Sequence, residues 1–490
     1  MKIDKSLKYN EEKFNEYKKT SADLNIRKIK IGSKELMYIF YESTSSDDKI
    51  SNFFMKSISY DVKNDNVNIF SNLFKILKNT IPNSSLKVIT TYKDVFLHLS
   101  SGFTCIFIDN FSEVIAIETK ASLDRSISEP TTDSIVRGPK DCFTENYMTN
   151  LGLIRKRIKD DNLKINEVIV GRRTNTKVSI IYLNNVVDLN EVNKIQKKLE
   201  SIDIDGILDS SYIREFIIKK SGIAFPRVLS TERPDLSCQA LLNGKTIIMV
   251  ENSPFVLIIP GLFFDFLKSP EDNYEKPLNA SFTRILRILS FFITILTPAI
   301  YITIMTYNAE IIPDKLLMSL AIQRQGVPFP SVVSVLLLLT TFEILRESDI
   351  RMPNLMGSSI GIVGALVLGD AAVSAGIVSP IVVIIIAITS VSGLLFSDID
   401  FVDAIRWWRL LFLIGSAIIG LIGIAIVGIM FITKLASIES MGVPYLSPLS
   451  PFSKRDQKDN FIRVKRDKIF KRPSYLAQKN QTKLGGNNEN

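Results

Sequence analysis

The stretch ILSFFITILTPAIYITIMTYNA, residues 288–309, decides the architecture of this chain. It is 22 residues long and contains no charged side chain. At a rise of about 1.5 Å per residue, a helix of this length spans the hydrocarbon core of a bilayer, which is about 30 Å thick. Up to about Leu278, by contrast, polar and apolar residues alternate as in a water-soluble protein. The sequence therefore predicts a hydrophilic first half joined to a membrane-crossing second half.

Further apolar segments predict the number of crossings. Residues 352–397 contain a single charge and are long enough for two passes, and residues 410–433 form an uncharged stretch long enough for another. The apolar run that begins at 329 is too short to span, so we expect a re-entrant or interfacial segment near 329–346. The predicted all-α polytopic membrane domain thus covers 281–436 and has about four spans.

The region before the membrane domain has the pattern of a mixed α/β protein. Apolar runs at 105–108 and 114–117 flank a polar turn and predict a β-hairpin. Residues 147–158 place apolar side chains at helical spacing, with basic residues from Arg155 onward largely on a solvated face. We expect a flexible segment over 1–50, followed by two cytoplasmic α/β subdomains over 51–165 and 166–280.

Charge distribution predicts which side of the membrane each end occupies. The formal net charge is +9, and residues 454–472 contain nine basic and three acidic residues. Basic segments next to spans stay on the cytoplasmic side. Residues Met1–Asn10 are polar and show no secretory signal, so the hydrophilic half is expected to remain in the cytoplasm. Both ends are therefore predicted to be cytoplasmic, with a basic tail over 437–490.

Residue patterns for catalysis, metal binding and nucleic-acid binding are incomplete. The chain has one histidine and three widely spaced cysteines, which argues against a histidine-based triad, a zinc site or a disulfide framework. Asn243-Gly244-Lys245-Thr246 resembles the end of a P-loop but lacks the glycine five residues before the Gly-Lys pair. The basic runs lack the interleaved aromatic residues that stack on bases. We expect no enzyme activity, cofactor, metal or nucleic-acid partner.

Two groups of charged residues lie within or beside the predicted spans. Asp370 interrupts a long apolar stretch, and such a charge usually faces a cavity, a pore or a partner. The alternative is a surface loop between two short spans, and the sequence leaves both interpretations open. Glu343, Arg346, Glu347 and Arg351 follow the short apolar segment. Because Glu343 and Arg346 share a helix face, we favour an ion-pair network over a plain extramembrane loop.

Short motifs along nearly the whole chain occur in the order of one known family. In the first half they include Arg137-Gly138-Pro139, Phe143-Thr144-Glu145-Asn146, Gly171-Arg172-Arg173, Asp205-Gly206-Ile207-Leu208-Asp209 and Thr231-Glu232-Arg233-Pro234-Asp235. In the second half they include Gln325-Gly326-Val327-Pro328-Phe329-Pro330, Phe342-Glu343-Ile344-Leu345-Arg346-Glu347, Ala375-Gly376-Ile377-Val378-Ser379-Pro380 and Gly442-Val443-Pro444-Tyr445-Leu446-Ser447-Pro448. On these motifs the sequence resembles the A subunit of GerA-type germinant receptors, the spore germination proteins of endospore-forming bacteria.

The chain departs from the family pattern in two turns. Glu251-Asn252 stands where the family usually shows Asp-Gly, and residues 396–400 lack a proline that is often present. The resemblance implies nutrient sensing in the spore inner membrane, together with a transporter-like B subunit and a C-subunit lipoprotein. It also implies that A subunits form homo-oligomers in the lipid membrane and conduct ions when a germinant binds, mainly to the B subunit. A stand-alone solute transporter or a membrane-tethered scaffold is the alternative function.

Residues 361–370 have the composition that a pore-lining helix requires. Their glycines permit close packing between helices, and their apolar side chains can form a constriction that closes by dewetting. We hypothesise that this helix lines the pore. The candidate pore or gate residues are Ile362, Val363, Leu366, Val367 and Asp370.

Overall fold

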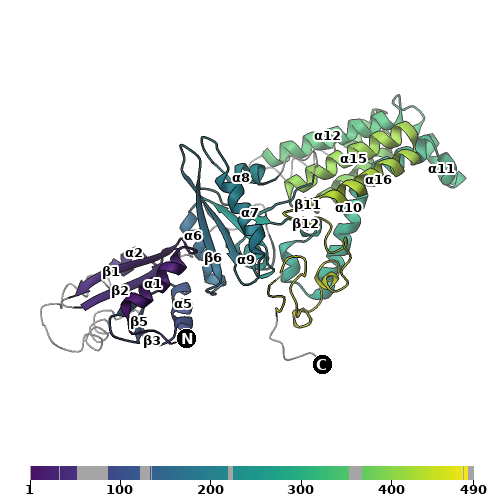
Figure 1. The fold of residues 1–490 in the computed structure, drawn as a ribbon. Coiled ribbons are helices and arrows are strands. Elements are labelled where there is room, and N and C mark those ends of the chain that lie inside the picture. The colour runs from purple at the N-terminus through teal and green to yellow at the C-terminus, as the bar shows by residue number, and fades with distance from the viewer. Residues whose placement is uncertain are drawn as a thin grey trace.

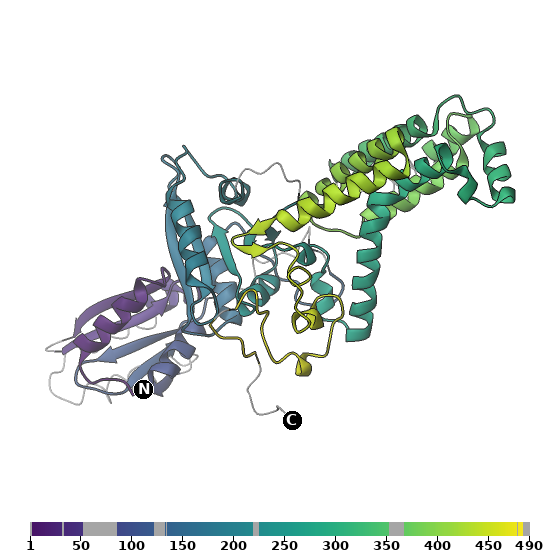
Figure 2. The ribbon, with the colours of Figure 1, turned by 45° about the vertical axis from the view of Figure 1, so that its right-hand side comes forward.

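The computed structural model describes residues 2–31, 34–51, 86–121, 133, 135–218, 225–351, 367–477 and 479–483, without the side chains of 31, 34 and 349–351. Two α/β subdomains lie one after the other and are followed by an elongated bundle of helices (Figure 1). The C-terminal segment, yellow in Figure 2, runs back from the bundle toward the second subdomain. The predicted order, α/β structure first and helices second, is confirmed.

The first subdomain is an antiparallel five-stranded sheet with helices on one face. Its elements are α1 (Leu7–Lys18), β1 (Leu24–Ile31), β2 (Lys34–Tyr41), α2 (Asp47–Lys49), β3 (Leu86–Ile89), α5 (Tyr92–Ser100), β4 (Phe103–Ile108) and β5 (Val114–Glu118). The strand order is β1-β2-β4-β5-β3. Helices α1 and α5 cover one face through Phe14 and Leu99. The hairpin predicted between 105 and 117 is confirmed, with Asn110 at a positive φ in its turn.

Residues in the range 1–50 differ from the expectation of a flexible segment. Strand β2 pairs with β1 along its whole length and with β4 on its other side, so it lies inside the sheet. The side chains of residues 36–41 are buried for that reason. The strand is hard to recognise in the sequence because polar residues flank it, such as the exposed Lys30 and Glu35 at the end of the hairpin. The first subdomain therefore begins near the N-terminus and not at residue 51.

The second subdomain is also an antiparallel five-stranded sheet, and helices cover both of its faces. Its elements are α6 (Tyr147–Arg157), β6 (Leu163–Val170), β7 (Thr176–Leu183), α7 (Leu189–Glu200), α8 (Ser210–Ile217), β8 (Leu229–Thr231), α9 (Pro234–Leu242), β9 (Thr246–Val250) and β10 (Val256–Ile259). The strand order is β6-β7-β9-β10-β8. Helices α6 and α9 pack on one face, and α7 and α8 pack on the other.

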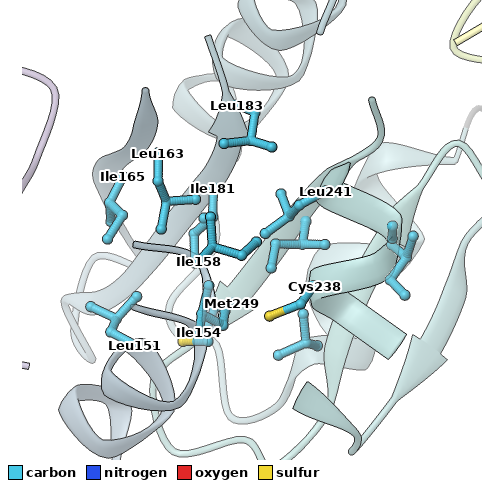
Figure 3. Close-up of a cluster of buried hydrophobic side chains, with 14 of the residues drawn as sticks. Leu151, Ile154, Ile158, Leu163, Ile165, Ile181, Leu183, Cys238, Leu241 and Met249 are labelled. Carbon is cyan, nitrogen blue, oxygen red and sulfur yellow. The ribbon is translucent and has the colours of Figure 1, made fainter. Parts of the chain in front are cut away.

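Helix α6 belongs to the core of the second subdomain. Ile154 and Ile158 lie against Ile181 and Met249 of the sheet and against Cys238 of α9 (Figure 3). The helix was expected to close the first subdomain, which placed the boundary at residue 165. Because its apolar face is buried by the second sheet, the boundary falls before α6.

The remainder of the chain is largely helical. Its helices are α10 (Pro277–Thr306), α11 (Asp314–Arg324), α12 (Ser331–Arg351), the helical residues 367–374, α14 (Pro380–Gly393), α15 (Ile399–Ile419) and α16 (Leu421–Ser437). Short 3-10 turns are η2 (Phe263–Asp265), η3 (Pro270–Asn273), η4 (Ala309–Ile311), η5 (Asp456–Asp459) and η6 (Arg466–Lys468). Phe291, Phe401 and Phe431 share one cluster beside the α/β region, whereas Ile302 and Leu413 share another at the far end. Helices α10 and α15 therefore run away from the α/β region, and α16 returns to it.

Two of the predicted membrane segments have a different arrangement in the structure. Residues 410–433, expected to be a single span, are divided at Gly420 into the antiparallel helices α15 and α16. The segment near 329–346, expected to be re-entrant or interfacial, forms most of α12, which has 21 residues, and its relation to a membrane stays a prediction. Among the described residues, one helix, α10, is long and apolar enough to cross a membrane, and α14 and α16 are shorter apolar helices.

Glycines and one tyrosine determine the turn between α15 and α16. Gly420 has a φ of +63°, and a Cβ atom there would lie 2.9 Å from the ring of Tyr307. The Tyr307 hydroxyl hydrogen-bonds to the carbonyl oxygens of Ala417 and Ile418, at 2.7 and 2.9 Å. A Cβ atom at Gly423 would lie only 1.9 Å from the carbonyl oxygen of Gly415. The two helices can approach this closely because both positions lack a side chain.

The C-terminal segment, predicted to be a basic tail, packs against the second subdomain. It contains the short strands β11 (Glu439–Ser440) and β12 (Val443–Pro444). The backbone N–H of Phe263 donates to the carbonyl oxygen of Tyr445 at 3.0 Å. Ala477 is fully buried in the core formed by α6, α9 and the sheet. The described part of the segment therefore belongs to the folded structure.

Candidate functional site

A charge cluster joins α12 to α15 inside the helical bundle. The carboxylate of Glu343 lies between two arginines, 2.8 Å from Arg406 and 2.6 Å from Arg409. Arg406 also pairs with Asp403 at 2.7 Å. Arg346, one turn along α12, interacts electrostatically with these groups but makes no direct ion pair within the described part of the chain. The charge cluster thus contains three arginines and two carboxylates.

The charge cluster lies halfway along the uncharged stretch of α10. The rings of Phe291 and Phe401 are 5.9 Å apart, and α10 and α15 run in the same direction from that contact. At an equal rise per residue, Arg406 and Arg409 are level with about residues 296 and 299 of α10. The uncharged stretch runs from 288 to 309, so these residues are near its middle. Charges in apolar surroundings are costly and are usually paired with one another.

The pairing differs from the one that the sequence suggested. Glu343 and Arg346 are three residues apart on one helix, yet the partners of Glu343 come from α15, 63 and 66 residues further along the chain. Glu347 is exposed on α12, and the side chain of Arg351 lies outside the described residues. Sequence analysis missed Asp403, Arg406 and Arg409. Their three-residue spacing on a helix was the available signal, but it does not indicate which other helix they face.

The candidate gate residues are only partly described. Ile362, Val363 and Leu366 lie outside the described residues. Val367 and Asp370 are on the helical residues 367–374, and both are exposed. Asp370 is therefore helical and not in a loop, and whether it faces a pore or lies at the membrane surface stays a prediction. A Cβ atom at Gly369 would meet Val383 at 3.5 Å, so this side of the helix packs on α14 and leaves Val367 and Asp370 on open faces.

An aromatic cluster connects the second subdomain to the helical bundle. Phe266 stacks on Phe401 of α15, with ring centroids 5.4 Å apart and planes within 5°. Phe263 meets Phe291 of α10 edge-on at 5.2 Å. Arg214 of α8 forms an ion pair with Asp400 in the first turn of α15. A displacement of the second subdomain would therefore move the ends of α10 and α15 with it.

Asp398 begins α15 at this connection. Its carboxylate accepts a hydrogen bond of 2.8 Å from the backbone N–H of Phe401, which caps the helix. Burial, with a smaller contribution from the negative charge of Asp400, raises the pKa of Asp398 to about 6. Its ionisation therefore falls near neutral pH, at the connection between the α/β region and the bundle.

Comparisons with known proteins agree on one family. A family model described as Bacillus/Clostridium GerA spore germination protein matches residues 12–475. Spore germination protein KA of Bacillus subtilis is 38% identical over 469 residues, which cover 95% of this chain and 86% of that protein. Spore germination protein GerLA of Bacillus cereus is 33% identical over 462 residues, which cover 94% of this chain and 93% of that protein.

Two further similarities extend the comparison. The uncharacterized membrane protein YfkQ of Bacillus subtilis is 35% identical over 407 residues, which cover 83% of this chain and 79% of that protein. The crystal structure of the N-terminal domain of the A subunit of the Bacillus megaterium spore germinant receptor GerK3 is 28% identical, with a TM-score of 0.43. The matched region covers 54% of this chain and 98% of the chain in that crystal structure. With a family match from residue 12 to residue 475, this chain belongs to the GerA family of spore germination proteins.

Proposed function

We propose that this protein is the A subunit of a nutrient germinant receptor in the spore inner membrane. In this proposal it oligomerises into an ion-conducting pathway that a germinant opens. Family membership supports the process, because relatives such as protein KA and GerLA are named spore germination proteins. The proposal assigns no enzymatic step to the chain. A transporter-like B subunit and a C-subunit lipoprotein are its expected partners.

The charge cluster is the observation that carries the conducting role. If the helical bundle crosses the bilayer, Glu343, Arg406 and Arg409 lie near the middle of the hydrocarbon core. Charged side chains at that depth are retained where they line a water-filled path or bind a partner. Arg346 adds a positive charge and makes no direct ion pair with the side chains that the structure describes, which do not include that of Asp349. A hydrated path beside α12 would lower the cost of this excess charge.

The proposed orientation follows from the direction of the helices. The bundle begins with α10 and ends with α16, and the ends of both next to the α/β region meet in the aromatic cluster. Both subdomains and the C-terminal segment therefore lie on one side of the proposed membrane, which we take to be the cytoplasm. The exposed faces of Val367 and Asp370 are then available to neighbouring copies, consistent with a shared pore lined by 361–370.

Ion flux through reconstituted protein tests the proposal. The full chain, alone and with its B and C partners, is placed in liposomes, and flux is measured with and without germinant. Glu343→Gln removes the carboxylate that pairs with Arg409 and leaves Arg406 with Asp403 alone, and we expect it to change germinant-dependent flux at least several-fold. Glu310→Gln, at an exposed acid in η4 at the far end of the bundle, is the matched control and should leave flux unchanged.

The same experiment separates the alternatives. Uptake of the germinant itself by the chain without partners would favour a stand-alone transporter. Assembly with the partners but no flux under any condition would favour a scaffold. If the Glu343→Gln variant inserts and assembles normally and its ion flux equals that of the unaltered chain, the charge cluster has no role in conduction.

A further inference from the structure

A cavity of about 690 Å³ lies where three parts of the chain meet. Its walls come from α9 and β10 of the second subdomain, from residues 265–273 that lead into the bundle, and from the C-terminal segment. The first residues of α15 complete the lining. This volume is within the usual range of small-molecule sites, which is about 300–1,000 Å³. We call it the junction cavity.

Charge is distributed unevenly around the junction cavity. Between residues 245–284 and 455–483 its lining contains eight basic and three acidic side chains. On the mouth, Lys458, Lys468, Lys471 and Lys483 are exposed. The other acidic lining residues are Asp133 and, at the start of α15 with Arg214, Asp398 and Asp400. One part of the cavity therefore has a clear excess of positive charge, which attracts anions.

Lys268 lines the junction cavity and makes no direct ion pair with the residues that the structure describes. Its neighbours are already paired, since Lys245 lies 2.5 Å from Asp265 and Arg284 lies 2.9 Å from Asp272. In the part of the chain that the structure describes, the Lys268 ammonium has neither an ion pair nor a hydrogen bond. Burial lowers the pKa of Lys268, although the nearby Asp265 acts in the opposite direction. The Lys268 side chain is partly buried, with Asp265 and Asp459 as nearby carboxylates, and a bound anion would give its ammonium the direct partner that it lacks among the described residues.

Another part of the lining is apolar. Leu236 and Ala240 of α9 and Ile258 of β10 line the cavity, together with Phe266. The same Phe266 stacks on Phe401 at the start of α15. A ligand here would therefore touch a side chain that connects the α/β region to the bundle. An apolar surface beside a lysine ammonium suits a molecule that has both an apolar part and an anionic group.

We propose that the junction cavity binds a small anion that carries a phosphate group and an apolar part, with Lys268 contacting the phosphate. A lysine ammonium binds phosphate as a point charge, and the exposed lysines at the mouth raise the local concentration of such anions. The ligand is either a soluble phosphate ester or the headgroup of an anionic lipid. This inference goes beyond the channel role and does not depend on it.

Binding is measured on the purified full chain in detergent. Two probes are used, inorganic pyrophosphate in solution and nanodiscs that contain phosphatidic acid, with uncharged phosphatidylcholine nanodiscs for comparison. We expect saturable binding of at least one phosphate probe, weakened roughly tenfold or more by Lys268→Gln because a charge-assisted contact is lost. Lys268→Arg keeps the charge and should retain most of the affinity. Lys315→Gln, at an exposed lysine of α11 far from the cavity, should bind as the unaltered chain does.

The two probes identify the source of the phosphate. Binding of pyrophosphate alone assigns a soluble ligand, and binding of phosphatidic acid alone assigns a lipid headgroup. Equal affinity of Lys268→Gln and the unaltered chain overturns the proposal, as does the absence of saturable binding by both probes. Occupation of the cavity by an acidic peptide segment of a copurified partner, with no phosphate binding, also overturns it. Loss of channel flux in any variant does not affect this test, because binding is measured directly.

Discussion

Arg155 of α6 donates two hydrogen bonds of 2.6 Å each to the carboxylate of Asp23, which lies in the other α/β subdomain just before β1. Neither side chain is exposed. The guanidinium also lies 3.7 Å from the ring centroid of Tyr41, and the Ser43 hydroxyl donates to Asp23 at 2.6 Å. Sequence analysis placed Arg155 on a solvated face, but the structure uses it to join the two subdomains.

Removing Arg155 should strongly destabilise the protein. Arg155→Met leaves the buried carboxylate of Asp23 without a cation, a change that typically costs about 3–5 kcal/mol. We expect a lower midpoint in urea unfolding of the purified full chain, followed by intrinsic fluorescence. Arg173→Met is the control, because Arg173 lies 3.7 Å from Asp205 with both side chains largely exposed. Such exposed pairs contribute at most about 1 kcal/mol. Equal effects of the two substitutions would contradict the assigned role.

Adding a methyl group between α15 and α16 should force these helices apart. In Gly423→Ala the new Cβ atom would lie 1.9 Å from the carbonyl oxygen of Gly415, so the backbone must shift. Overpacking of this kind costs about 1–3 kcal/mol. Gly428→Ala is on the same helix, and its Cβ atom would meet Phe412 at 3.9 Å, an ordinary contact. Thermal unfolding in detergent should show a lower midpoint for Gly423→Ala than for Gly428→Ala, and the reverse order would refute the close crossing.

The raised pKa of Asp398 predicts a pH dependence of stability. Burial raises this pKa to about 6, above the ordinary aspartate value of 3.8. The folded state therefore binds a proton more tightly than the unfolded state. The stability that this provides is complete below pH about 4 and is lost as the pH rises through about 6. The full loss is about 3 kcal/mol at 1.36 kcal/mol per pKa unit.

Asp398→Asn should remove this dependence. Asparagine keeps the helix cap, since its side-chain oxygen can accept from the backbone N–H of Phe401, and it carries no charge to bury. We expect the variant to be more stable than the unaltered chain at pH 7. The difference between their free energies of unfolding should become smaller toward pH 4. Asp467→Asn, at an exposed acid of the C-terminal segment, is the control. Parallel stability curves for Asp398→Asn and the unaltered chain from pH 4 to 7 would show that Asp398 is not responsible.

The Tyr307 hydroxyl should stabilise the end of α15. Tyr307→Phe keeps the ring that packs over Gly420 but removes the hydrogen bonds to Ala417 and Ile418. The last carbonyls of a helix have no partner within it, so we expect a loss of about 0.5–1.5 kcal/mol in thermal unfolding. Tyr212→Phe, at an exposed tyrosine of α8, should have an effect near zero. A variant as stable as the unaltered chain would mean that other donors replace the hydroxyl.

Local patterns predicted much of the α/β region. The β4–β5 hairpin and helix α6 both appear where alternation and helical spacing indicated them. The boundaries between units were less predictable. Helix α6 has an apolar face that either sheet could bury, and only its contact with Ile181 and Met249 assigns it to the second subdomain. Likewise, β2 becomes an inner strand only because β4 pairs with it.

For the charge cluster too, the sequence predicted some features, and others became clear only in the structure. The sequence indicated that Glu343 and Arg346 were unusual charges next to apolar residues, and it located the long apolar stretch in which such charges are costly. It did not indicate Arg409 as the partner of Glu343, because these residues are 66 positions apart and lie on different helices. The uninterrupted apolar run over 410–433 also concealed the turn at Gly420, which the Tyr307 ring and the glycine contact stabilise.

By itself, the sequence determined the order of an α/β region and an apolar helical region, the family, and individual elements such as the β4–β5 hairpin and helix α6. These properties depend on composition, periodicity and local spacing, which can be read within about twenty residues. The tertiary structure alone decided that Arg155 pairs with Asp23, that Glu343 lies between two arginines of α15, and that Lys268 lines the junction cavity. The physical reason is that ion pairs and cavities form between segments far apart in the chain, and their partners are set by packing and not by local preference.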